Sequence, residues 1–239
     1  MLGQMLQPAL FGFPDLFMST YKHVFKVPER RLKNIRGVLL DLDNTLYSYD
    51  MCHEAAMKSS YISVRRAINI SFEEFKKRYN VSRQEIKKWI YGRAASHSRL
   101  LYFQNLFEHY FGVTRAWLTL KAERAYWNGF FKKMKPYSGV RDFLIRCRKN
   151  GVAVCLVTDL TAEIQLRKII CLKIANLIDL VVSSEEAGAD KPHKSMYILA
   201  LKKLGCSPKE VILVGDDDCN KKDIRGAKAI GIRAILANK

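Results

Sequence analysis

Hydrophobic positions along the chain follow two different periods, which divide it into segments of different secondary structure. Short apolar runs predict buried strands, whereas apolar residues at spacings of three and four predict helices. The predicted strands are 37–40, 152–157, 180–182, 211–214 and 234–236. The predicted helices after residue 136 are 140–149, 162–172, 194–204 and 223–229. Because these helices and strands alternate, we predict an α/β fold with a parallel sheet covered on both faces.

The segment between the first strand and residue 136 shows the helical period. Ser71 and Ser82 each stand three residues before a glutamate, a capping-box pattern that predicts a helix start at each. Apolar residues keep helical spacing through the rest of the segment, with a predicted helix end at Gly112. We therefore predict an α-helical insert over residues 50–135 whose aromatic side chains fill its core.

These patterns predict three parts. Residues 1–35 form an N-terminal extension, residues 36–49 and 136–239 form the α/β core, and residues 50–135 form the helical insert. Residues 1–18 are fairly apolar but lack a basic start and contain Pro8, Pro14 and Asp15, so they fit neither a secretory signal nor a membrane span. We expect this segment to pack along the core or to be disordered. Contact of its apolar residues with a membrane interface is a less favoured alternative.

The charge of the chain is strongly basic and unevenly placed. Lys and Arg number 41 against 23 Asp and Glu, giving a net charge of +18 and a pI of about 9.7. Residues 58–135 alone carry 17 basic and 5 acidic side chains. This excess favours an anionic partner, which can be a phosphorylated metabolite, a nucleic acid or an acidic membrane surface.

Six cysteines are spread along the chain without a Cys-x-x-Cys pair. Scattered cysteines of this kind are typical of reduced thiols in the cytoplasm. We therefore predict free thiols and a cytoplasmic protein, and we find no apolar run long enough to predict a transmembrane segment.

Polar residues suited to phosphate chemistry follow three of the predicted strands. Asp41 and Asp43 stand at positions i and i+2 after the first strand, so they share a face and repel each other unless a cation or a proton lies near them. Thr158 and Asp216 follow two later strands, and Lys191 precedes a proline between them. Because the carboxyl ends of parallel strands meet at one edge of a sheet, we predict one site for a metal ion and a phosphate.

These segments resemble the four motifs of the haloacid dehalogenase-like (HAD) hydrolases. The motifs are Asp41-Leu42-Asp43-Asn44-Thr45, Thr158, Lys191-Pro192 and the segment from Gly215-Asp216 to Gly226-Ala227. Their order and spacing match the family over roughly residues 36–236. The resemblance implies a HAD-like Rossmannoid three-layer core with a parallel sheet, and an α-helical cap inserted after the first motif.

The resemblance also implies a role for each motif residue. Asp41 is the expected nucleophile and forms an aspartyl phosphate, while Asp43 protonates the leaving oxygen and later activates water. Mg²⁺ is expected to bind Asp41, the backbone carbonyl of Asp43 and Asp216. Thr158 and Lys191 are expected to bind the phosphoryl group and stabilise its charge.

Two features depart from the family pattern. Asp159 stands where Asn or Gly is common, and we expect it to point away from the phosphate or to cap the following helix. The fourth motif is lengthened, which leaves its second acidic position open among Asp217, Asp218 and Asp223. Asp223 is also a candidate N-cap for the helix that follows it.

Within the insert, Arg93, His97 and Arg99 are candidate substrate-binding residues, with a solvated helical face as the alternative. Dehalogenase-type members of the family lack an acid at the position of Asp43, so its presence favours phosphoryl transfer. We predict a Mg²⁺-dependent phosphomonoester hydrolase that acts on a small phosphorylated metabolite, either a nucleotide or a sugar phosphate.

Two alternatives stay open. A sugar phosphomutase of the same family uses the same nucleophile and acid. A module that binds nucleic acid or an anionic membrane through the basic insert belongs to another class, with nucleic acid less favoured. The oligomeric state stays open.

Overall fold

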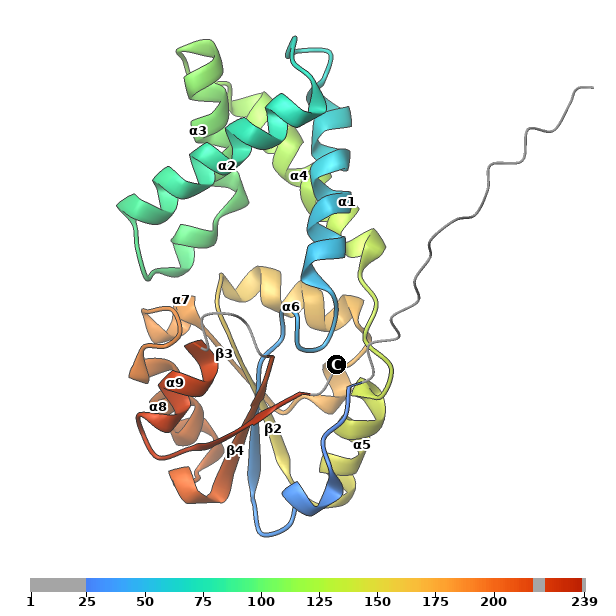
Figure 1. Ribbon diagram of the computed structural model, residues 1–239, viewed down its shortest axis with the longest axis vertical. Coiled ribbons are helices and arrows are strands. Elements are labelled where there is room, and N and C mark those ends of the chain that lie inside the picture. Colours follow the sequence, from blue (N-terminus) through green and yellow to red (C-terminus); the bar gives the residue numbers. More distant parts are fainter. Residues whose placement is uncertain (1–24, 217–221, 238–239) are drawn as a thin grey trace, which may run out of the picture.

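The computed structural model describes residues 25–216 and 222–237. They form a five-stranded parallel sheet with flanking helices, and a group of helices beyond one end of that sheet (Figure 1). The strands are β1 (Gly37–Leu40), β2 (Ala153–Thr158), β3 (Leu180–Ser183), β4 (Val211–Gly215) and β5 (Arg233–Leu236). Their order is β3-β2-β1-β4-β5, which places β1 at the centre of the sheet and confirms each predicted strand.

Helices cover both faces of the sheet because alternate strand residues are buried on opposite sides. Val38 and Leu40 belong to one hydrophobic cluster, and Leu39 belongs to the other. The first cluster includes residues of α5 (Val140–Lys149) and α6 (Ala162–Cys171), and the second includes residues of α8 (Lys194–Leu204) and α9 (Lys222–Lys228). The predicted α/β fold class, with three layers, is confirmed.

Short helices connect several of these elements. They are α7 (Ser184–Ala187), η1 (Glu29–Arg31), η2 (Ala94–His97), η3 (Ala175–Leu177) and η4 (Pro208–Glu210), of which the η elements are 3₁₀ helices. Part of the predicted N-terminal extension lies within the described residues, and Phe25 packs against Phe143 of α5 with ring centroids 5.1 Å apart. Residues 1–24 lie outside the described part.

The predicted helical insert folds as a group of helices beyond the carboxyl ends of the strands (Figure 1). Its members are α1 (Tyr49–Val64), α2 (Phe72–Trp89), α3 (Arg99–Phe111) and α4 (Ala116–Lys133), together with the segment between α2 and α3 that contains η2. Gly129 lets α4 lie close to α1, since a Cβ atom there would stand 2.6 Å from the Cβ of Ser59. Aromatic side chains such as Tyr79, Phe103 and Phe107 are buried inside the group, as the sequence predicts.

One predicted helix start within this group is wrong. The hydroxyl of Ser71 accepts a hydrogen bond from the amide of Glu74 and caps α2, as predicted. Ser82, however, lies inside α2, which continues to Trp89, and its side chain is buried. The buried positions Phe75, Tyr79, Ser82 and Ile86 repeat at spacings of three and four, so packing of one face keeps the helix continuous through the second capping-box pattern.

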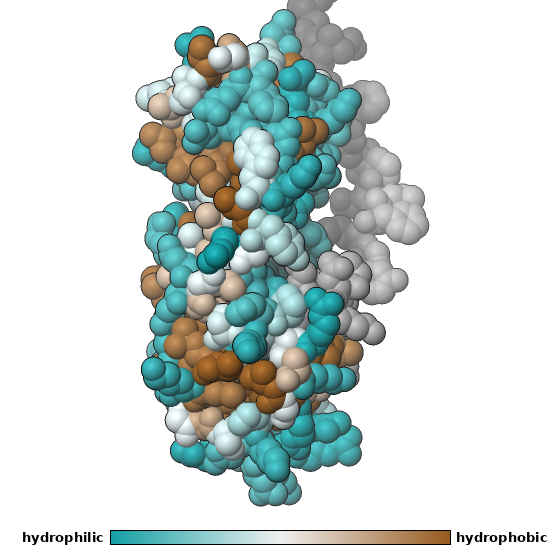
Figure 2. Space-filling model, turned by 90° about the vertical axis from the view of Figure 1, so that its left-hand side faces the viewer, coloured by the Kyte–Doolittle hydropathy of each residue, from teal (hydrophilic) through white to brown (hydrophobic). Residues whose placement is uncertain are grey.

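The hydropathy of the surface differs between the helical group and the core. Figure 2 shows mostly hydrophilic residues over the upper part of the helical group and a hydrophobic band across the lower part of the core. Among the described residues, no helix combines the length and apolar character that crossing a bilayer requires. The five cysteines in the described part of the chain are all free thiols.

Candidate active site

Three carboxylates converge where β1 and β4 end. Asp41 follows β1, Asp216 follows β4, and Asp223 lies in the first turn of α9. One carboxylate oxygen of each lies within 4.8 Å of the others, and all three side chains are buried. Buried carboxylates this close repel one another unless a cation compensates them. Carboxylate oxygens are the ligands that Mg²⁺ prefers, so this cluster fits a divalent metal ion.

Lys191 supplies one positive charge to this cluster. Its Nζ lies 2.5 Å from Oδ1 of Asp41 and 2.7 Å from Oδ1 of Asp223, and the side chain is buried. Burial alone would lower the pKa of Lys191, but Asp223 and Asp41 hold it well above its usual value. Burial raises the pKa of Asp223 to about 7, and Asp41 adds to this while Lys191 opposes it. Lys191 is therefore an ammonium shared by two acids.

The structure holds the carboxylate of Asp41 from both sides. Its Oδ1 receives Lys191, and its Oδ2 accepts a hydrogen bond of 2.7 Å from the hydroxyl of Thr45. The backbone amide of Asp41 donates to the carbonyl of Val214 on β4, which extends the sheet by one hydrogen bond. These contacts fix the side chain at the edge of the sheet.

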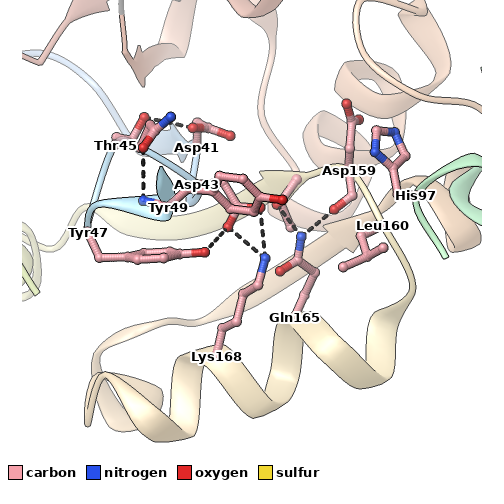
Figure 3. A network of polar contacts seen from close by, with 12 residues as sticks. Asp41, Asp43, Thr45, Tyr47, Tyr49, His97, Asp159, Leu160, Gln165 and Lys168 are labelled. Atoms are coloured by element: carbon pink, nitrogen blue, oxygen red, sulfur yellow. Dashed lines mark hydrogen bonds and ion pairs between the residues drawn. The ribbon is translucent and has the colours of Figure 1, made fainter. Parts of the chain in front are cut away.

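Asp43 has different interaction partners from Asp41. Its two carboxylate oxygens each lie 2.7 Å from Nζ of Lys168, and the hydroxyl of Tyr47 donates to Oδ1 at 2.5 Å (Figure 3). Burial would raise the pKa of Asp43, but the Lys168 ammonium and these hydrogen bonds outweigh burial and lower it. Lys168 is fully buried, so in the ligand-free site this ion pair favours the carboxylate form of Asp43.

Thr158 and Asp159 are held by other residues of the core. Gln165 of α6 donates from Nε2 to the hydroxyl oxygen of Thr158 at 2.7 Å and to the carbonyl oxygen of Asp159 (Figure 3). Asp159 does not cap α6, whose N-cap is Thr161, so that part of the expectation is wrong. Its Oδ1 instead accepts from the backbone amide of Lys191 at 2.8 Å, which ties two of the motifs together.

Asp223 also differs from one sequence expectation. It is the second residue of α9 rather than the residue before that helix, so the N-cap alternative is wrong. Gly226 lets α9 approach α8, because a Cβ there would lie 2.4 Å from Cε2 of Tyr197. The hydroxyl of Tyr197 donates to the carbonyl of Asp223 at 3.2 Å. Asp217 and Asp218 lie outside the described residues.

These groups line a cavity of about 310 Å³ between the core and the helical group. Its lining includes Asp41, Asp43, Thr158, Lys191, Asp216 and Asp223 from the core, and Arg83, Lys87, His97 and Arg99 from the helical group. The predicted core residues therefore line the same cavity as His97 and Arg99, two of the three predicted substrate-binding residues.

The predicted substrate-binding residues differ in their contacts. Arg93 is not among the lining residues, and it donates to the carbonyl of Gly188 at 2.9 Å. His97 lines the cavity, and its Nε2 lies 3.1 Å from Oδ2 of Asp190. Arg93 and His97 therefore join the helical group to the core loop before Lys191, whereas Arg99 faces the cavity with a buried guanidinium.

Sequence reasoning missed Lys168, Gln165 and Tyr47, which hold Asp43 and Thr158. Lys168 did leave a signal, because it occupies an apolar position of α6, four residues after the buried Ile164. A lysine on the buried face of an amphipathic helix needs an acid partner inside the protein. Arg83 and Lys87 were also missed, since nothing in the sequence separates them from the other basic residues of the insert.

A family model described as haloacid dehalogenase-like hydrolase matches residues 38–237. The chain belongs to this family, so the resemblance is confirmed.

Named relatives support the phosphatase type. Ribulose-1,5-bisphosphate 5-phosphatase from Halopiger xanaduensis is 36% identical over 202 residues, which cover 84% of this chain and 83% of the relative. Glyceraldehyde 3-phosphate phosphatase from Methanopyrus kandleri is 32% identical over 204 residues, with coverage of 84% and 83%. The prediction of an enzyme that hydrolyses phosphoric monoesters is confirmed at the level of class.

Solved structures agree on the fold. The HAD-hydrolase YfnB from Bacillus subtilis, in a form bound to magnesium, has a TM-score of 0.62 and 18% sequence identity to this chain. The match covers 84% of this chain and 86% of that one. Enzymes of the superfamily generally use a divalent metal ion, for which the cluster of Asp41, Asp216 and Asp223 is a candidate site.

Proposed function

We propose that this chain is a Mg²⁺-dependent phosphatase that releases inorganic phosphate from a small sugar phosphate. The observation that carries the proposal is the convergence of Asp41, Asp216 and Lys191 at one edge of the sheet, in a cavity wide enough for a small ligand. The two relatives are named for ribulose 1,5-bisphosphate and glyceraldehyde 3-phosphate, which supports the substrate class.

In the first half of the proposed reaction, a carboxylate oxygen of Asp41 attacks phosphorus. The bond between phosphorus and the sugar oxygen breaks, and that oxygen takes a proton from Asp43, which has to be protonated in the enzyme–substrate complex for this step. Thr158 donates a hydrogen bond to a phosphoryl oxygen, and Lys191 balances the charge of the transferring group. The products of this half are the free sugar and an aspartyl phosphate on Asp41.

In the second half, Asp43 takes a proton from water, and the water oxygen attacks phosphorus. The bond to Asp41 breaks, which regenerates the carboxylate and releases inorganic phosphate. Mg²⁺ held by Asp41, Asp216 and the backbone carbonyl of Asp43 would neutralise charge on the phosphoryl group. Asp223 completes the acidic cluster and holds Lys191.

We further propose that residues 50–135 act as a cap over a core of residues 36–49 and 136–239. The cavity is lined from both parts, which supports this division. We also place the protein in the cytoplasm, for which the free thiols among the described cysteines are the support.

Purified protein is expected to release inorganic phosphate from a panel of sugar phosphates with Mg²⁺ and to stop when EDTA removes the metal. Free phosphate is the readout. An isomerised sugar phosphate with little free phosphate would support the phosphomutase alternative instead. Release that continues unchanged in EDTA would contradict the metal dependence.

Removal of Lys168 is expected to change the pH profile of this reaction. In Lys168→Met, the cation that lowers the pKa of Asp43 is gone and burial remains, so the pKa of Asp43 rises. Asp43 must carry a proton to act as the acid, so the alkaline limb of kcat should move to higher pH by about one unit or more. Arg167→Gln, a partly exposed position on the same helix, serves as the control. A limb that stays in place or moves to lower pH would refute this role of Lys168.

A further inference from the structure

The two walls of the cavity differ in charge: the wall from the core is mainly acidic, and the wall from the helical group is basic. The core contributes the acids and Lys191, whereas the helical group contributes Arg83 and Lys87 from α2 and Arg99 from the start of α3. Arg83 and Lys87 are four residues apart on one helix, so they lie on the same side of α2. A ligand that fills the cavity therefore meets a candidate metal and phosphate site on the core wall and cationic side chains on the wall of the helical group.

Among the cationic side chains that the helical group contributes to the cavity, Arg99 is the most informative because its guanidinium is buried. It donates to the carbonyl of His97 at 2.6 Å and to the hydroxyl of Tyr49 at 2.5 Å, both neutral acceptors. Its guanidinium carbon also lies 5.2 Å from the ring centroid of Trp127. Within residues 25–216 and 222–237, no carboxylate lies at ion-pair distance from Arg83 or Arg99. A buried cation without a paired anion is costly, and a bound anion would compensate it.

The charges of Arg99 and Arg83 act on their surroundings. Burial lowers the pKa of His53 to about 4, and Arg99 and Arg83 both add to that shift. His53 lies against the ring of Tyr49, which also lines the cavity, with ring centroids 5.7 Å apart. Both guanidinium groups therefore contribute positive potential to the part of the helical group that lies next to the cavity.

We propose that Arg99, together with Arg83 and Lys87, binds a second phosphate group of the substrate. The substrate class is then a sugar bisphosphate, with one phosphate at Asp41 and the other held by the helical group. Guanidinium groups suit this role because their donors match phosphate oxygens in pairs. Arg93 and His97 are not part of this subsite, since Gly188 and Asp190 bind them. The inference rests on the proposed function and names its substrate class.

The test compares a sugar bisphosphate with the matched monophosphate that has a hydroxyl in place of the distal phosphate. For the wild type we expect kcat/KM to be at least about 10-fold higher for the bisphosphate at low salt. Arg99→Gln, and separately Arg83→Gln with Lys87→Gln, should lower that preference about 10-fold. Arg115→Gln, an exposed arginine of the helical group outside the cavity, should leave the preference unchanged.

The outcomes separate the two proposals. Equal kcat/KM for the two compounds in the wild type would overturn the second-phosphate subsite and leave the phosphatase proposal intact. Absence of phosphate release from both compounds would overturn the phosphatase proposal and this inference with it. The α2 variant keeps the test decisive if Arg99→Gln fails to fold, because Arg83 is exposed and Lys87 is partly exposed, and an unfolding transition like that of the wild type would show that this variant is folded. An unchanged preference in that α2 pair would also overturn the inference.

Discussion

Replacement of Asp41 by asparagine is expected to lower Mg²⁺-dependent phosphate release by at least about 10⁴-fold, because an amide cannot attack phosphorus in place of a carboxylate. The substitution keeps the size of the side chain and leaves an oxygen to accept from Thr45 or Lys191. The ion pair between Lys191 and Asp223 also remains. We therefore expect a folded protein whose loss is confined to chemistry, measured by phosphate release at saturating substrate.

Asp142→Asn is the matched control for this prediction. Asp142 is exposed in the first turn of α5, outside the cavity. The control should retain wild-type turnover. Retained turnover in Asp41→Asn, with an unfolding transition like that of the wild type, would remove Asp41 from the nucleophile role.

Lys191→Met is expected to affect both activity and stability. Loss of the ammonium should lower kcat by about 10²–10³-fold, as for the loss of one group that stabilises transition-state charge. It also leaves Asp41 and Asp223 buried without their shared cation, which should cost about 3–5 kcal/mol of unfolding free energy in metal-free protein near pH 8.

The stability loss in Lys191→Met should depend on pH and on metal. Burial raises the pKa of Asp223 to about 7 in the wild type, and removal of Lys191 raises that pKa further. Folded protein then binds more protons than the unfolded chain, so stability falls as pH rises toward 8 and recovers toward pH 5. Mg²⁺ should stabilise the variant more than the wild type, since it replaces the missing charge.

Denaturant unfolding at pH 5 and pH 8, with and without Mg²⁺, measures these effects. Lys203→Met is the control, because Lys203 lies on the same core but pairs with the partly exposed Glu186. A loss of stability that is the same at both pH values and insensitive to Mg²⁺ would contradict the assigned sharing of Lys191 by two acids.

The sequence was informative where local pattern and sheet topology decide position. Asp41 and Asp216 each follow an apolar run, and parallel strands bring such positions to one edge whatever the intervening length. The role of Lys168 was not predictable in this way. It meets Asp43 across 125 residues of sequence, and that contact depends on how α6 packs against the sheet.

The helical insert shows a second limit. Its composition predicted a basic surface, but the structure turns Arg83, Lys87 and Arg99 toward the cavity and uses Arg93 to bind the core. Ser82 shows the same limit at the level of one helix. A capping-box pattern is local, and burial of one continuous face of α2 overrides it. The residue types identified the candidate residues, but only the packing of the helices determined which of them line the cavity.

The most direct test of the account is chemical trapping of the phosphorylated enzyme during turnover with Mg²⁺ and a sugar phosphate. Borohydride reduces an acyl phosphate to a primary alcohol, so the peptide that contains Asp41 should show conversion of that carboxyl group to an alcohol by mass spectrometry. The conversion should require substrate and should be absent in Asp41→Asn. Rapid phosphate release with no reduced residue, or with reduction at another acid such as Asp216, would contradict the central claim.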